Sequence, residues 1–139
     1  MNQVTLGGIE AVSIPTLGLG QILAKVDTGA WSGALHCTHI RQHDGMLSFW
    51  PLGNSRLKIK TDVFQRVHVR SANGHAAERY LIPVEINVQG VSYQTVIGLN
   101  DRSTMTRDML IGRRFLIENN ILVDVSRTKE LDEEAEKTL

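Results

Sequence analysis

Apolar and polar residues alternate along much of the chain with a period of two, which places successive side chains on opposite faces of a β-strand. The pattern is clearest in RLKIKT at residues 56–61 and VFQRVHV at residues 63–69. Gly, Pro and Asn residues separate such runs, as expected where strands end in turns. We expect strands over residues 4–6, 11–14, 22–26, 46–50, 56–61, 63–69, 83–88 and 91–97.

Two tight turns join neighbouring strands into hairpins. Asn73-Gly74 lies between VHVRS and AERYLI, and both of its residues tolerate the positive φ that a two-residue hairpin turn requires. Gln89-Gly90 marks a second turn between two further apolar runs. Many short strands at this spacing indicate a β-sandwich or a β-barrel.

Helical character is confined to two segments near the C-terminus. Residues 113–119, RRFLIEN, follow a glycine and predict one short helix. Residues 129–139, KELDEEAEKTL, have high helix propensity but few apolar side chains, so we expect a frayed or disordered helix there. Because no repeat or interdomain linker is visible, we expect one domain over residues 1–126 and an acidic tail over residues 127–139.

Composition narrows the class of protein. The 139 residues are 42% hydrophobic and 22% charged, which is ordinary for one globular domain with a real core. The formal net charge is zero, so no general nucleic-acid or membrane-surface binding is expected. Cys37 is the single cysteine, which excludes an internal disulfide and fits a reducing compartment. Without a signal-peptide pattern or a long apolar run, we expect a cytoplasmic protein.

One short motif suggests chemistry. Asp27-Thr28-Gly29 directly follows an expected strand. Peptide hydrolysis without a metal or a nucleophilic side chain needs an activated water, and two carboxyl groups about 3 Å apart that share one proton can activate it. In this interpretation Asp27 supplies a carboxyl group, Thr28 a hydroxyl that locks the loop across a symmetry axis, and Gly29 room for a backbone N–H to reach the carboxylate.

A second element, about 80 residues further along, fits the same interpretation. Residues 109–111 are apolar, and Gly112 permits a strand to pass close to the loop of residues 27–29. The hairpin with its tip at Asn73 and Gly74 lies between the two elements. Such a hairpin can fold over a cleft and hold an extended peptide by adding to its backbone hydrogen bonds.

The ordered set of motifs resembles the retropepsins, the single-lobe aspartic proteases of retroviruses. Within that group it is most similar to a bacterial family labelled "ATP-dependent zinc protease" and also described as RimB-like. The similarity covers about residues 10–125. It is carried by KVDTGA at 25–30, ALH at 34–36, SANGHAAERY at 71–80, Asn100-Asp101-Arg102 with Met105, and MLIGRRFL at 109–116.

The resemblance implies a mostly β fold, namely a closed retropepsin-like acid-protease barrel with one short C-terminal helix, acting as a homodimeric aspartic endopeptidase. Some members of the family are encoded near RimK-type ligases, which add glutamates to protein tails. Their protease partners trim such tails, so a glutamylated tail is the implied substrate.

The number of Asp-Thr-Gly motifs also predicts a dimer. The chain has one such motif, and none of its other acidic residues lies in an equivalent strand-Asp-Thr/Ser-Gly context. An aspartic mechanism therefore needs one Asp27 from each of two chains across a two-fold axis. Because one carboxyl group of the pair must keep its proton, we expect an acid-leaning pH optimum.

Further residues are candidates for substrate binding or for support of the site. Members of the family usually carry a basic residue where this chain has Trp31, and Trp31 cannot hold an acidic substrate by charge. Arg79 and Arg102 can do so instead. The candidate substrate-binding residues are Ala30, Trp31, Ser32, Asn73, Gly74, Arg79 and Arg102. Gly112 and Arg113 are expected to support the active-site loop.

The sequence does not favour a metal site. His36, Cys37, His39 and His43 are suitable ligand types for zinc, but their spacing matches no common zinc motif, and no HExxH is present. We expect a buried Cys37, a hydrogen-bonded His36 and two exposed histidines, and no cofactor. Two alternatives to the peptidase remain: a catalytically silent peptide-binding module on the same fold, and a zinc-dependent hydrolase that uses these four residues.

Overall fold

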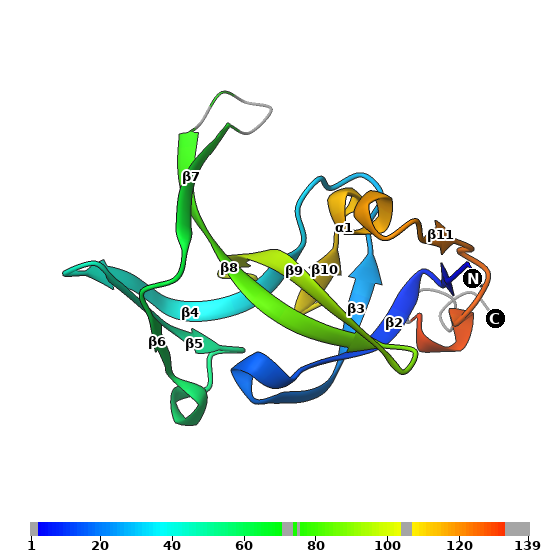
Figure 1. Cartoon of the computed structure of the whole chain (residues 1–139), viewed down its shortest axis with the longest axis horizontal. Coiled ribbons are helices and arrows are strands. Elements are labelled where there is room, and N and C mark those ends of the chain that lie inside the picture. Colours follow the sequence, from blue (N-terminus) through cyan, green and yellow to red (C-terminus); the bar gives the residue numbers. More distant parts are fainter. Residues whose placement is uncertain (1–2, 71–73, 75, 104–106, 133–139) are drawn as a thin grey trace.

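The computed structural model describes residues 3–70, 74, 76–103 and 107–132, and they fold mainly into β-strands (Figure 1). The strands are β1 (Thr5–Leu6), β2 (Ile9–Ile14), β3 (Leu19–Val26), β4 (Ala34–His43), β5 (Met46–Pro51), β6 (Ile59–Thr61), β7 (Gln65–Arg70), β8 (Ala76–Val88), β9 (Val91–Asn100), β10 (Met109–Ile111) and β11 (Leu122–Val123). The helices are α1 (Arg113–Glu118) and the 3₁₀ turns η1 (Pro15–Leu17), η2 (Ser55–Leu57) and η3 (Lys129–Leu131).

Six strands close into a barrel. They follow the order β10-β3-β2-β8-β9-β4, and β4 pairs with β10 through Leu35 opposite Met109 and Ala34 opposite Leu110. The barrel encloses an apolar core that includes Val12, Ile14, Leu35, Val84, Ile86, Leu99 and Met109. The expected closed, mostly β barrel with one short C-terminal helix is therefore confirmed.

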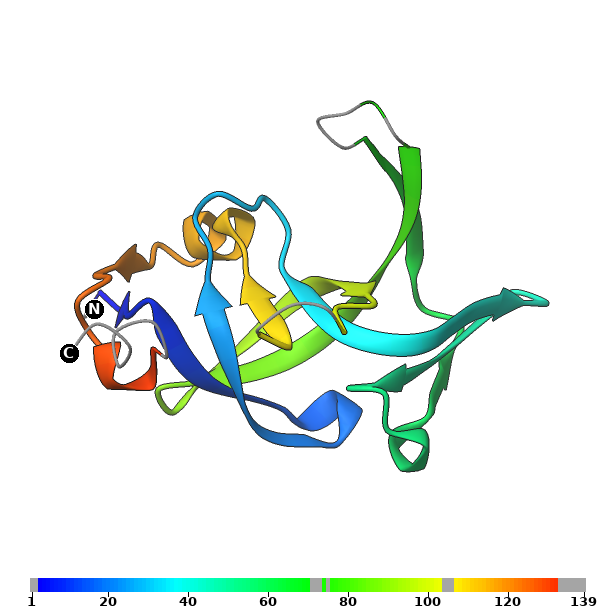
Figure 2. The same cartoon turned by 180° about the vertical axis from the view of Figure 1, so that it is seen from behind.

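Two strands run beyond the barrel and carry its extensions. The first part of β4 pairs with β9 and β10, whereas its continuation pairs with β5, which pairs in turn with β6. The 13-residue β8 likewise pairs with β9 along the barrel and with β7 beyond it. The β7–β8 hairpin rises on the same side of the barrel as the loop after β3, and Figure 2 shows this from behind. Its tip includes Asn73, which lies outside the described residues, and Gly74 at φ +84°.

Each expected strand has a counterpart in the structure, but several bounds differ: β8 begins at Ala76 and not at residue 83, and the short strand β11 was not predicted. The strand β4 was not predicted, because a β-bulge between Thr38 and Arg41, with His39 at φ 53°, breaks its alternation. The strand predicted over residues 56–61 begins only at Ile59. Asn54 is the reason, because its side chain accepts a hydrogen bond from the Arg56 N–H at 3.0 Å and caps a 3₁₀ turn there.

The segment after α1 returns to the start of the chain. β1 and β11 form a parallel pair, and the Asp124 N–H donates to the Leu6 carbonyl at 2.8 Å. The Thr128 hydroxyl donates to the Ile9 carbonyl.

Within the expected helix at 129–139, the described part is the single turn η3, and residues 133–139 lie outside the described residues. The division between domain and tail at residue 127 stays a prediction. None of the helices in the described ranges is long and apolar enough to cross a membrane.

Candidate active site

Asp27 stands at the end of a parallel strand pair. β3 lies alongside β10 in parallel register, and the ladder ends with an N–H of Asp27 donating to the carbonyl of Ile111 at 2.9 Å. The N–H of Gly29 donates to Oδ1 of Asp27 at 2.9 Å, and the N–H of Ala30 donates to the backbone carbonyl of Asp27 at 3.2 Å. The backbone position and one carboxylate oxygen of Asp27 are therefore fixed, as a catalytic carboxylate requires.

The start of α1 binds the loop that follows Asp27. The N–H groups of Arg113 and Arg114 donate to the carbonyls of Ala30 and Trp31, at 2.7 and 3.0 Å. The first N–H groups of a helix have no partners within the helix, so the loop satisfies two of them. The guanidinium of Arg113 also donates to the carbonyl of Thr28 at 3.0 Å and lies 5.5 Å from the centre of the Trp31 ring.

Glycine is required where β10 passes this loop. A Cβ at Gly112 would lie 2.5 Å from the carbonyl carbon of Ser32 and 2.7 Å from the carbonyl oxygen of Trp31, so any side chain would displace the loop. A Cβ at Gly33 would lie 3.0 Å from the carbonyl oxygen of Leu110, and the Gly33 carbonyl accepts the N–H of Gly98 at 3.0 Å. The loop is thus fixed to both β9 and β10, and Gly112 lies at the crossing that the sequence predicted.

The tip of the loop is open to solvent in the single chain. Thr28 and Gly29 are exposed, Asp27 is half-buried, and the Trp31 side chain is 52% exposed. Within the described part of the chain, the hydroxyl of Thr28 has no hydrogen-bond partner. The half-buried Asp27 and the exposed Thr28, whose hydroxyl has no partner among the described residues, are therefore neighbours on one accessible surface.

A cleft of about 340 Å³ lies between this loop and the base of the β7–β8 hairpin. It brings together four of the predicted substrate-binding residues, namely Trp31, Ser32, Arg79 and Arg102. Val67 and Leu81, which the sequence did not single out, complete the wall on the side of the hairpin. Ala30 and Gly74 do not line the cleft.

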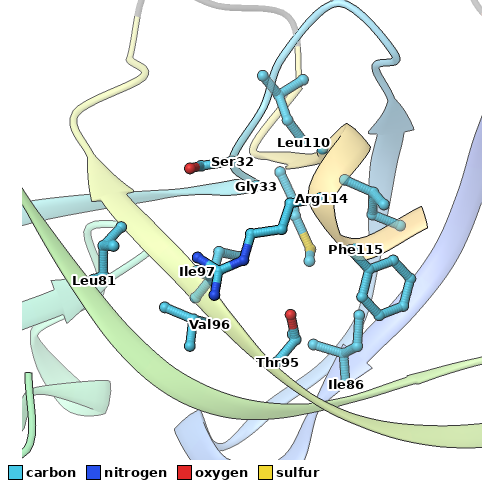
Figure 3. Close-up of a pocket in the computed structure, with 13 residues that line it drawn as sticks. Ser32, Gly33, Leu81, Ile86, Thr95, Val96, Ile97, Leu110, Arg114 and Phe115 are labelled. Carbon is cyan, nitrogen blue, oxygen red and sulfur yellow. The ribbon is translucent and has the colours of Figure 1, made fainter. Parts of the chain in front are cut away.

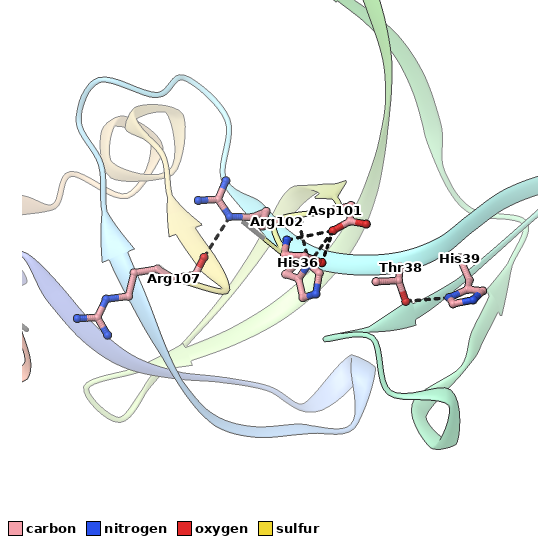
Figure 4. A network of polar contacts seen from close by, with 7 residues as sticks. His36, Thr38, His39, Asp101, Arg102 and Arg107 are labelled. Atoms are coloured by element: carbon pink, nitrogen blue, oxygen red, sulfur yellow. Dashed lines mark hydrogen bonds and ion pairs between the residues drawn. The ribbon is translucent and has the colours of Figure 1, made fainter. Parts of the chain in front are cut away.

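Arg102 is a buried cation at the wall of the cleft. Only 7% of the residue is exposed, and its Nε donates to the carbonyl of Arg107 at 3.2 Å (Figure 4). No carboxylate of the described residues lies within salt-bridge distance of it. Burial and then the charge of Arg79 lower the pKa of Arg102, and the charges of Asp108 and Asp27 partly oppose this shift. A cation in such surroundings favours an anionic ligand.

The four candidate zinc ligands are distributed along β4. His36 and Cys37 are buried, and burial raises the pKa of the Cys37 thiol to about 12. His39 stacks on Trp50 with ring centres 3.5 Å apart, and His43 lies 3.2 Å from a carboxylate oxygen of Asp44. Among the described residues, no three His, Cys, Asp or Glu side chains are grouped to hold a metal ion.

A second hollow lies on the other side of Ser32 and Gly33, against α1 (Figure 3). The Arg114 side chain extends over it toward Ile97 and Val96. Its free space of about 20 Å³ holds little more than a water molecule. We therefore assign this hollow to the packing of α1 on the barrel.

Comparison with known proteins adds family information. The family described as "RimB-like: Retropepsin-like aspartic endopeptidase RimB" matches residues 5–134. Proteins named "Probable alpha-L-glutamate ligase" from Shewanella pealeana and Parasynechococcus marenigrum are 32% and 30% identical over 136 and 138 residues. These alignments cover 91% and 93% of this chain, but the chain spans only 30% and 29% of the length of those relatives.

A solved structure has the same fold. A DUF785 protein of unknown function from Legionella pneumophila superposes with a TM-score of 0.70 at 22% identity. The match covers 91% of this chain and 97% of that one.

Proposed function

The chain belongs to the RimB-like family of retropepsin-like aspartic endopeptidases, and on this premise we propose that it is an aspartic peptidase that works as a homodimer. The observation that carries the proposal is the position of Asp27. Its backbone is fixed by β10, and its carboxylate is oriented by the N–H of Gly29. A two-fold axis beside this loop would bring two such carboxyl groups together.

The surface around Asp27 supports a dimer. Exposed apolar side chains occur at Ile117 on α1 and at Leu122 on β11, with 64% and 53% of their surface accessible. The loop after β3, α1 and β11 follow one another along one side of the barrel in both views (Figures 1 and 2). We place the contact between the two chains there, where the unpaired Thr28 hydroxyl can bind the partner's loop.

In the proposed reaction, the two carboxyl groups share one proton. The ionised carboxylate takes a proton from water, the water oxygen bonds to the peptide carbonyl carbon, and the other carboxyl group protonates the carbonyl oxygen. The tetrahedral species then returns one hydroxyl proton to a carboxylate, and the other carboxyl group protonates the leaving nitrogen as the C–N bond breaks. The pair again holds one proton.

The cleft favours an acidic substrate, which we take to be a glutamylated protein tail. Arg79 and the buried Arg102 supply two positive charges to one cleft, although Trp31 replaces the usual basic residue of the family. Relatives named as glutamate ligases suggest that a ligation reaction supplies such tails. The free thiol of Cys37 fits the cytoplasm as the compartment.

A second function is supported by the cleft itself. Asp27 is not among the residues that line it, so peptide binding there does not require a pair of Asp27 carboxyl groups. A silent peptide-binding module would therefore bind acidic tails as a monomer without turnover.

The test combines oligomeric state with cleavage of a glutamate-tailed peptide. We expect sedimentation to detect a dimer and the rate per chain to rise with protein concentration. Asp27→Asn should abolish cleavage, whereas Asp62→Asn, at an exposed position on the far extension of the barrel, should not. Cleavage that survives Asp27→Asn would overturn the aspartic mechanism, and tight peptide binding by a wild-type chain that shows no turnover would favour the binding module.

A further inference from the structure

We propose that His36 is a positioning residue, which fixes the backbone of Arg102 and thereby holds the Arg102 guanidinium at the cleft. The inference rests on the proposed function for the identity of the anionic ligand. Of the described residues, the buried polar or charged ones are Glu10, His36 and Arg102. Two of these three contact each other at the wall of the cleft.

The contact defines the state of the imidazole. The backbone N–H of Arg102 donates to Nδ1 of His36 at 2.8 Å. An amide N–H cannot accept, so Nδ1 must offer its lone pair. The ring is therefore neutral in this arrangement and carries its proton on Nε2.

Backbone hydrogen bonds on both sides of residue 36 hold His36, the acceptor, in place. The N–H of His36 donates to the carbonyl of Asp108 at 2.7 Å, and its carbonyl accepts the N–H of Leu52 at 2.9 Å. The neighbouring carbonyl of Arg107 accepts from Nε of Arg102. The carbonyls of residues 107 and 108 thus accept from the side chain of Arg102 and from the backbone N–H of His36, respectively. Figure 4 shows His36 and Arg107 on either side of Arg102.

The turn that leads into Arg102 is also ordered. Oδ1 of Asp101 accepts from the N–H and the hydroxyl of Ser103 at 3.0 and 2.6 Å, and it lies 3.7 Å from Nδ1 of His36. Asp101 is exposed and its carboxylate is used by Ser103, so it does not replace the imidazole as the partner of the Arg102 N–H. Beyond the backbone pairing of β9 with β4, the His36 side chain connects this turn to β4.

A side chain at residue 36 without an acceptor would leave the buried Arg102 N–H unpaired. The turn of residues 101–103 would then move to find another partner, and the guanidinium would move with it. Binding of a carboxylate in the cleft should weaken, whereas binding of a neutral ligand of the same shape should not. This distinguishes a positioning role from a general role in folding.

Three substitutions separate these effects. His36→Asn retains an amide oxygen near the place of Nδ1, His36→Gln moves it toward the place of Nε2, and His36→Leu removes it. Each is combined with Asp27→Asn, which prevents turnover. Calorimetry then measures the affinity for a glutamate-rich peptide and for the same peptide with glutamine at each glutamate.

We expect His36→Leu and His36→Gln to reduce the preference for the glutamate peptide by about tenfold, and His36→Asn to retain it. The affinity for the glutamine peptide should be the same in all variants. An unchanged preference in His36→Leu, or an equal loss for both peptides, would overturn the inference. If His36→Leu does not fold, the comparison of His36→Gln with His36→Asn decides.

A measurement without ligand keeps this inference separable from the peptidase proposal. In ¹⁵N spectra of the Asp27→Asn protein near neutral pH, Nδ1 of His36 should appear unprotonated, and the Arg102 amide proton should shift upfield in His36→Leu but not in His36→Asn. A protonated Nδ1 would overturn the positioning role. If the spectra agree but neither peptide binds, the acidic-substrate proposal fails and the specificity role of His36 fails with it.

Discussion

The N–H of Arg113 donates to the carbonyl of Ala30 at 2.7 Å, so α1 begins on the loop that carries Asp27. These residues are 83 positions apart in the sequence (113 minus 30). Loop and helix therefore need each other to satisfy their backbone groups, and changes at this junction should affect both stability and the proposed activity.

Gly112→Ala should destabilise the fold. The new Cβ would lie within 2.8 Å of three backbone atoms of the loop, none of which can turn away as a side chain does. Overpacking of this kind typically costs about 1–3 kcal/mol, and chemical denaturation measures it. Gly20→Ala is the matched control, since a Cβ there meets no atom within 4 Å. Equal stability of the two variants would contradict the close crossing.

Thr28→Val should weaken the proposed dimer without affecting the folded monomer. The hydroxyl of Thr28 is exposed and has no partner within the described residues, so its loss leaves no unpaired group inside the chain. Loss of hydrogen bonds across the two-fold axis should raise the dimer dissociation constant by about tenfold. Analytical ultracentrifugation measures this, with Thr28→Ser as the control that keeps the hydroxyl. A Thr28→Val dimer of wild-type strength would place the interface elsewhere.

Arg79→Gln should reduce kcat/KM for a glutamate-tailed peptide by about tenfold, because one of two cleft cations is removed. The fold should keep its stability, since Arg79 is only partly buried. Steady-state kinetics are compared with those of Arg41→Gln, which removes an exposed charge on the β4–β5 extension. A similar loss in both variants would mean that net charge, and not the cleft, attracts the substrate.

Cys37 should resist alkylation in the folded protein. Burial raises the pKa of its thiol to about 12, so almost no thiolate exists at mildly alkaline pH. A raised thiol pKa contributes stability that is complete below the unfolded thiol value of about 8.5 and is lost as pH rises toward 12. Mass spectrometry after iodoacetamide treatment should detect labelling only once denaturant unfolds the chain. Rapid labelling without denaturant would contradict a buried Cys37.

Asp124 should titrate below the ordinary aspartate value of 3.8. The hydroxyl and N–H of Ser126 donate to its Oδ1 and lower its pKa. A lowered pKa stabilises the fold above the unfolded value, and this contribution is lost as pH falls through the folded one. Carboxyl NMR measures the midpoint, which should rise in Ser126→Ala. An identical midpoint in that variant would remove Ser126 as the cause.

The sequence predicts the parts of this molecule that depend on local signals. Gly112 after an apolar strand indicated the crossing at Asp27, and Asn73-Gly74 indicated the hairpin between β7 and β8. β4 was missed because its bulge at His39 breaks the alternation on which strand prediction depends. The contact between His36 and the buried Arg102 could not be predicted from local signals, because the two residues are 66 positions apart in the chain.

The parallel pairing of β1 with β11 has a consequence for how this fold combines with others. Thr5 and Leu122 are direct neighbours, so the polypeptide enters and leaves the barrel at one place. That place lies at the opposite end of the molecule from the β4–β5 extension (Figure 1). A longer polypeptide can therefore contain the barrel as one continuous segment, and its other parts need not pass the cleft. In the relative from Shewanella pealeana, the matching region is 30% of the length.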